Sequence, residues 1–180
     1  VVPFAWEGAG VLSENVSQIV IDDLQQVGEF RALSPGNMLS LPNEENEVFY
    51  RDWRVLAQDY LLVGKITRAT GSQLVQVQYE FFDVNRELKL AGEILTGSVT
   101  QLRDIGHEIS NVVFELVTGT RGAFTTQILY IVSEEVGGQT VFRLEKADYD
   151  GQRAQVLLES NEPIMSPSWS PNGQDIAYVS

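Results

Sequence analysis

The chain has 180 residues, 43% of them hydrophobic, which suffices for one large domain or for one domain and part of another. Its formal net charge of −13 disfavours non-specific binding to nucleic acid or to anionic membranes, because both depend on clusters of Lys and Arg. The absence of cysteine excludes disulfides and thiolate metal sites, and it leaves the redox compartment open.

The first well-marked element is a helix. An apolar run at residues 1–6 predicts a buried strand, and after a loop Asn15 is placed to cap a helix that Gly28 ends. One face of this helix is apolar and consists of Val16, Ile19, Val20, Leu24 and Val27. Weaker signals then predict a short strand at residues 30–33, a surface loop at 34–47 and one or two helical turns at 52–58.

The middle of the chain reads as a sheet followed by a second helix. The predicted strands cover residues 60–67, 74–84 and 93–99, with a turn at 70–72. Residues 102–117 predict a helix that ends at Gly119, with Leu102, Ile105, Ile109, Val112, Val113 and Leu116 facing inward. Two helices and about five strands indicate an α/β domain with a mixed sheet.

The pattern changes to strands alone after Gly122. Strands are expected at residues 128–133, 141–146 and 155–158, separated by turns at 137–138 and 148–151. Residues 166–180 predict a hairpin whose turn is Pro171-Asn172-Gly173 and whose one buried aromatic is Trp169. The sequence Ile-Leu-Tyr-Ile at 128–131 recurs as Ile-Ala-Tyr-Val at 176–179, about 48 residues later, a spacing typical of propeller blades.

Several motifs, in the same order along the whole chain, resemble the TolB family. They are Val-Val-Pro-Phe-x-Trp at residues 1–6, Leu-Val-Thr-Gly-Thr-Arg-Gly-Ala-Phe at 116–124, Ala-Asp-Tyr-Asp-Gly at 147–151 and Met-Ser-Pro-Ser-Trp-Ser-Pro-Asn-Gly at 165–173. The resemblance implies an α/β domain at residues 1–122, similar to anticodon-binding domains. It also implies part of a six-bladed β-propeller at 123–180, with three strands of the closing blade and the first two of the next.

The resemblance further implies a function without catalysis. Family members are periplasmic adaptors of the Tol-Pal system that bind the lipoprotein Pal through the propeller and TolA through a segment before the first strand. They maintain the outer membrane during envelope constriction, and some colicins exploit them. We expect this chain, which begins at Val1 without a signal peptide and ends inside a blade, to lack the TolA-binding segment and most of the Pal-binding face. The resemblance assigns no residue of this chain as a contact for Pal or TolA.

Two candidate sites near the helices have simpler structural explanations. Gly8 and Gly10 follow a strand, as in a dinucleotide-binding loop, but Ser13 stands where the third glycine belongs, which favours a plain loop. His107 is the one histidine, so a multi-histidine metal site is excluded. Its position on the polar side of the second helix favours a surface or domain-junction residue over a catalytic one.

The acidic and aromatic candidates also favour structural roles. Asp148 and Asp150 before Gly151 resemble part of a calcium loop, but later acidic ligands are missing and Asp-Gly is a common hairpin turn. Glu44, Glu45 and Glu47 are interpreted as a solvated loop, and Trp169, Tyr130 and Tyr178 as core between strands. We therefore assign no catalytic, cofactor-binding or metal-binding residue and predict no cofactor.

Two other classes of function fit the sequence less well than the adaptor. Propellers with similar repeats accompany serine peptidases, but that function requires a G-x-S-x-G nucleophile elbow, which the sequence lacks. A nucleic-acid module, suggested by the likeness to anticodon-binding domains, would need a basic face, and the charge of −13 argues against it.

Overall fold

The structure, a computed structural model, describes residues 1–68 and 74–180, and the turn expected at 70–72 lies outside them. The chain forms two compact units, Val1–Gly122 and Ala123–Ser180, and each is described by itself. The first is α/β and the second consists of strands, as expected for this fold class. Among the described residues, no helix combines the length and the apolarity that a bilayer span requires.

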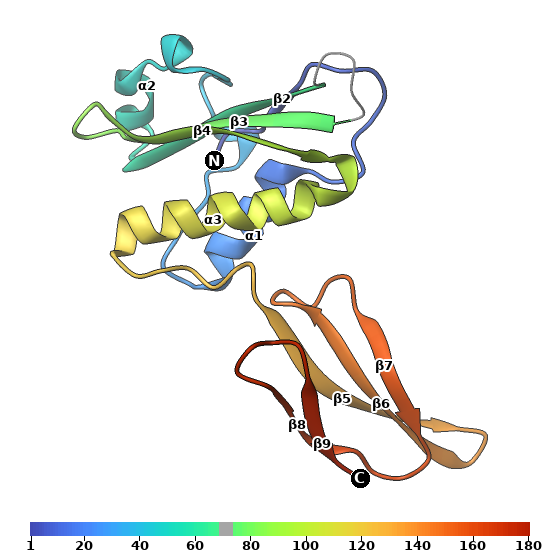
Figure 1. Cartoon of the computed structure of the whole chain (residues 1–180). Coiled ribbons are helices and arrows are strands. Elements are labelled where there is room, and N and C mark those ends of the chain that lie inside the picture. The colour runs from blue at the N-terminus through green and yellow to red at the C-terminus, as the bar shows by residue number, and fades with distance from the viewer. Residues whose placement is uncertain (69–73) are drawn as a thin grey trace. The chain divides into compact units, whose positions relative to one another are not determined.

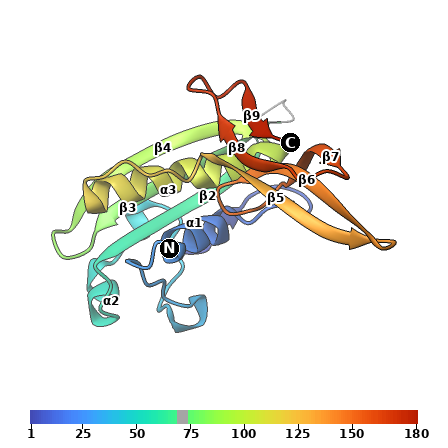
Figure 2. The same ribbon diagram turned by 90° about the horizontal axis from the view of Figure 1, so that it is seen from below.

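A four-stranded sheet with the order β1-β2-β3-β4 forms the centre of the first unit. Its strands are β1 (Ala5–Trp6), β2 (Tyr60–Arg68), β3 (Leu74–Asp83) and β4 (Leu88–Ser98). β1 pairs in parallel with β2, and the other pairs are antiparallel. Two helices, α1 (Val16–Gln26) and α3 (Leu102–Thr118), lie side by side against one face, which we call the inner face (Figures 1 and 2).

The two helices begin and end where the sequence predicts. The Asn15 side chain accepts a hydrogen bond from the Gln18 amide at 3.2 Å, and Gly28 follows α1 with a φ of +84°. Gly119 ends α3 with a φ of +74°, and its amide donates to the carbonyl of Glu115. Positive φ is accessible to glycine at little cost, so both glycines stop helices at these points.

The α1–α3 contact depends on a glycine. A Cβ atom built on Gly106 would lie 2.8 Å from the Cγ2 atom of Ile19, which is closer than real side chains approach. Gly106 therefore lets the two helix backbones come together. Because α3 packs against α1 as well as against the sheet, residues outside its sheet-facing stripe are also buried, among them Gly106, His107 and Ser110.

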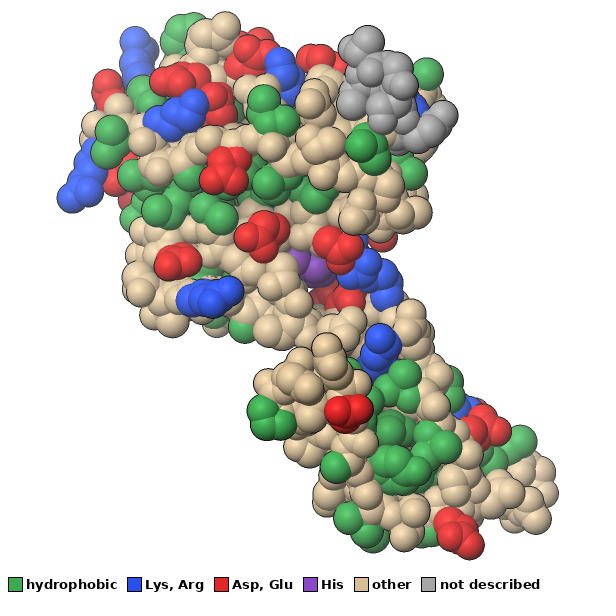
Figure 3. All heavy atoms as spheres, in the orientation of Figure 1, with side chains coloured by type: hydrophobic (Ala, Val, Ile, Leu, Met, Phe, Trp, Pro, Cys, Tyr) green, Lys and Arg blue, Asp and Glu red, His purple; other side chains and the backbone are tan. Residues whose placement is uncertain are grey.

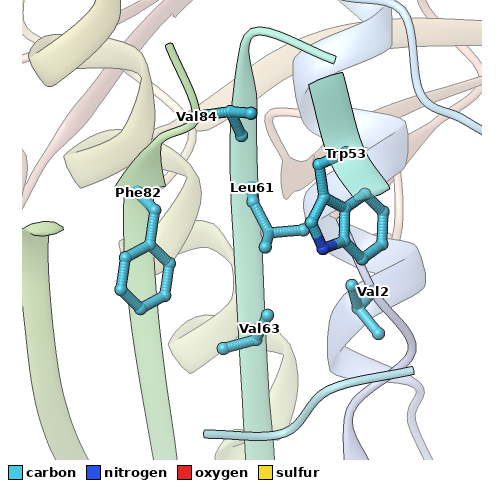
Figure 4. Packing of buried hydrophobic residues seen from close by; sticks show 6 residues of the cluster. All are labelled: Val2, Trp53, Leu61, Val63, Phe82 and Val84. Atoms are coloured by element: carbon cyan, nitrogen blue, oxygen red, sulfur yellow. The ribbon is translucent and has the colours of Figure 1, made fainter. Parts of the chain in front are cut away.

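The opposite, outer face of the sheet is partly covered by α2 (Tyr50–Val55) and by the segment before it. Trp53 of α2 is 2% exposed and packs on Leu61 of β2 beside Val2 (Figure 4). The whole buried cluster is Val2, Trp53, Leu61, Val63, Phe82 and Val84. This second core makes the first unit a three-layer structure at this end of the sheet.

Several expected boundaries in the first unit were wrong. Residues 30–33 form no strand, and the strand expected at 1–6 is reduced to β1, although the Val2 amide also donates to the carbonyl of Leu62. α2 begins two residues earlier than the predicted turns, and β4 begins at Leu88 instead of residue 93. Pairing with β3 decides the start of β4, because it extends the ladder through a bulge at Phe81/Phe82.

The second unit contains a three-stranded antiparallel meander and a separate hairpin. The meander is β5 (Gln127–Val136), β6 (Gln139–Asp148) and β7 (Gln155–Ser160), and the hairpin is β8 (Met165–Trp169) with β9 (Ile176–Val179). The expected turn at Gly137 and Gly138 is present, both with positive φ. Trp169 is only half-buried, contrary to the expectation of a buried aromatic, since a two-stranded sheet gives it few neighbours.

Candidate functional site

Charged side chains on the outer face tie the segment before α2 to the sheet. The carboxylate of Glu80 on β3 is buried; it accepts the Glu45 amide at 2.6 Å and pairs with the Lys89 ammonium. Lys89 also contacts Glu45 at 3.1 Å, and Lys65 pairs with Glu44. The hydrogen bond to Glu80 raises the pKa of Lys89, which keeps this ammonium charged.

Glu45 and Glu47 are exposed, as the interpretation of Glu44, Glu45 and Glu47 as a solvated loop expects, but these contacts give the loop a structural role as well. Glu44 and Glu45 hold lysines of the sheet, and the Glu47 carboxylate accepts the Asn43 amide at 2.8 Å. Local composition cannot reveal this role, because both lysines are distant in sequence and reach the loop only through strand pairing.

The one histidine lies in the helix layer. His107 and Asp23 are each at most 2% exposed, and the Nδ1 atom of His107 lies 2.8 Å from the Oδ2 atom of Asp23. The contact joins α3 to α1 inside the first unit. The expectation of a surface position for His107 was therefore wrong, because this side of its helix packs against α1. A ring enclosed in this way is suited to holding two helices together.

A cavity of about 450 Å³ lies in the first unit, near the start of β2. Leu24, Leu62, Phe81 and Val113 form its apolar wall, and Glu29, Arg31 and Asp59 supply charged groups. Its volume falls in the range of small-ligand pockets. The sequence does not reveal this cavity, because these residues come from four separate segments.

The other motif candidates are turns. Gly10 has positive φ, and its carbonyl accepts the Trp6 indole N–H at 3.0 Å, so the loop closes on itself. The Asp148 carboxylate accepts from Arg153 at 2.6 Å, and that of Asp150 accepts the Gln152 amide at 3.0 Å. Both carboxylates thus take part in the hydrogen bonds of the turn. Tyr130 is half-buried and Tyr178 is 43% exposed, so neither is the core residue that was expected.

Comparisons with known proteins match both units. Residues 1–90 match the family model of the TolB amino-terminal domain, and residues 114–180 match that of the TolB beta propeller domain. The Tol-Pal system protein TolB of Hahella chejuensis is 43% identical over 180 residues, all of this chain and 42% of that protein. The protein of the same name from Pseudomonas aeruginosa is 45% identical, over all of this chain and 41% of its own length.

A solved structure shares the fold. The crystal structure of TolB from Acinetobacter baumannii matches with a TM-score of 0.84 and 28% identity, over all of this chain and 44% of that one. The chain thus spans about two fifths of the length of these relatives. The amino-terminal domain model matches half of the chain, the propeller model matches its last part, and a solved TolB structure shares its fold. The chain therefore belongs to the TolB family.

Proposed function

We propose that the chain is part of a non-enzymatic periplasmic adaptor of a Tol-Pal system. The observation that carries this proposal is the similarity of the entire chain to proteins named Tol-Pal system protein TolB. The geometry of the first unit supports this proposal. The one histidine, His107, is enclosed between two helices, where it could not act as the base of a catalytic triad on a substrate from solution. A scaffold of rigid sheets is well suited to presenting loops to other proteins.

The partners follow from the family resemblance. Pal would bind the propeller, mostly through blades that are not part of residues 1–180. TolA would bind a segment that precedes the first strand. Colicins would use the same adaptor for import. The function of the whole assembly would be to maintain outer-membrane integrity and to support envelope constriction during division.

Calorimetric titration with soluble Pal tests this proposal. Pal would be titrated into this chain and, in parallel, into a full-length TolB such as that of Pseudomonas aeruginosa. We expect heat of binding for the full-length protein and little or none for this chain. A titration of the full-length protein with the TolA domain would extend the test to the second partner.

Each outcome has a distinct meaning. Binding by the full-length protein alone would support the adaptor function and the position of the Pal contacts in the remaining blades. Equal binding by both proteins would support the adaptor function but contradict that position. Absence of binding by either would contradict the adaptor proposal.

A further inference from the structure

Strand β4 forms one edge of the sheet in the first unit. It pairs with β3 on one side, and the described residues supply no strand on its other side. Alternate residues of such an edge direct N–H and C=O groups outward, where another strand can pair with them. The bulge at Phe81/Phe82 and the ion pair of Lys89 with Glu80 on the outer face protect one end. Residues 92–98 contain neither Pro nor Lys and pair regularly with β3, so this part of the edge is available.

An apolar band of side chains lies beside this edge. α3 contacts both β3 and β4, and a Cβ on Gly97 would meet the Ile105 side chain at 3.2 Å. Leu95 and Val112 are half-buried there, and Leu116, one helical turn after Val112, is 44% exposed. Figure 3 shows a band of hydrophobic side chains between β4 and α3, with acidic side chains on both sides of it. A strand added to β4 would cover this band.

Two carboxylates and a buried hydroxyl lie at one point beside this apolar band. Glu93 pairs across the strands with Tyr79. Burial raises the pKa of Tyr79, and the charges of Glu93 and of Glu108 on α3 raise it further. Neither the Glu93 nor the Glu108 carboxylate makes a hydrogen bond or ion pair with the described residues. The Tyr79 hydroxyl, fully buried, likewise has no hydrogen-bond partner among them. This point therefore has unbalanced negative charge that a cation would neutralise.

We propose that residues 92–98 bind an extended basic segment of a partner protein as a fifth strand of this sheet. A Lys or Arg of the segment would lie between Glu93 and Glu108. The side chain two residues away, on the same face of the added strand, would be apolar and would cover Leu95. This surface belongs to the first unit and does not depend on the partners proposed above.

The negative charge of this surface favours a basic segment over a second copy of the chain as the strand that pairs with β4. Antiparallel pairing of two β4 strands near their centres would bring together two copies of Glu93, in molecules that each carry a net charge of −13. A basic segment instead gains opposite-charge contacts at the same place, and the acidic protein would accelerate its approach.

A short synthetic peptide provides the probe. Its sequence is Thr-Val-Thr-Lys-Thr-Val-Thr with both ends blocked, which reads the same in either direction and so suits parallel and antiparallel pairing. Titration into the isotope-labelled chain, followed by amide chemical shifts up to about 5 mM peptide, detects affinities in the millimolar range. We expect shifts concentrated on residues 92–98 and on the facing side of α3, and slower amide exchange along that edge.

Variants and altered peptides separate charge from backbone pairing. Glu93→Gln and Glu108→Gln should each weaken binding about two- to fivefold, whereas Glu7→Gln, which changes an exposed carboxylate beside the opposite edge strand β1, should leave it unchanged. A peptide with Glu in place of Lys should not bind. Two further peptides carry N-methyl groups on one or the other set of alternate amides, and we expect one set to abolish binding and the other to retain it.

The proposal would be overturned by three results. One is the absence of shifts at residues 92–98 at the highest peptide concentration. A second is binding that neither glutamate variant nor N-methylation alters. The third is dimerisation of the chain through β4, detected by sedimentation, that prevents the peptide from binding. In that case a second copy of the chain would occupy the edge.

Discussion

At the scale of single residues, the Tyr79 hydroxyl is the clearest unfavourable group in the first unit. The side chain is fully buried, and the hydroxyl has no hydrogen-bond partner among the described residues. An unsatisfied buried hydroxyl costs about 1–3 kcal/mol. Tyr79→Phe should therefore raise the free energy of unfolding at neutral pH by about 1 kcal/mol. Urea unfolding measures this change, and Tyr60→Phe, at a side chain that is 38% exposed, is the control.

The same residue predicts a pH dependence. Burial raises the pKa of Tyr79 from 10.0 to about 12. Because this pKa is higher in the folded state, the contribution of the neutral phenol to stability is complete below pH 10.0 and is lost as the pH rises towards 12. The native chain should thus lose about 1 kcal/mol more than Tyr79→Phe between pH 9 and pH 11. An equal loss of stability in the native chain and in Tyr79→Phe would contradict the assignment of this pH dependence to Tyr79.

The buried pair of Asp23 and His107 gives a second prediction at this scale. Removing one partner takes this hydrogen bond from the other, which stays buried, so Asp23→Ala should destabilise the first unit by about 2–4 kcal/mol. His107→Ala should cost a similar amount, and the double variant should cost clearly less than the two single losses together. Thermal unfolding of all four proteins measures this coupling. Strict additivity would show that the two side chains contribute independently.

At the scale of elements, the packing of α1 on α3 makes a glycine necessary inside a helix. Alanine normally favours a helix over glycine by about 1 kcal/mol. At Gly106 its Cβ would lie 2.8 Å from Ile19 Cγ2 and 3.1 Å from Ile19 Cβ, so the helices would have to separate. Gly106→Ala should therefore cost about 1–3 kcal/mol, measured by urea unfolding.

Gly36 provides the matched control for this substitution. A Cβ on Gly36 meets no atom within 4 Å, and its φ is not positive. Gly36→Ala should change stability by less than about 0.5 kcal/mol. Equal effects of the two substitutions would contradict the role assigned to the helix contact.

At the scale of the whole molecule, the first unit contains every layer that its cores need. The four-stranded sheet, both helices of the inner face and the α2 layer all lie within Val1–Gly122. A polypeptide of residues 1–122 should therefore fold alone and unfold in one cooperative transition. Circular dichroism during urea titration tests this. A gradual loss of helical signal without a transition would show that the second unit is required.

The sequence alone determined the elements whose signals are local and strong. The caps at Asn15 and Gly119, the alternation along β3 and the glycine turn at 137–138 predicted the main helices and strands, because backbone geometry at these places depends on neighbouring residues. The ordered motifs likewise indicated the TolB family, which the domain matches confirm.

Tertiary structure alone decided which polar groups are buried and what they contact. Glu80 is buried because a distant segment covers it, and His107 is buried because α3 packs on a second helix as well as on the sheet. The packing of α3 against β3 and β4 brings Glu93 and Glu108 near Tyr79 in the same way. Such contacts join residues that are far apart in the chain. Hydrophobic periodicity cannot predict them, because it indicates only which face of a single helix or strand is buried.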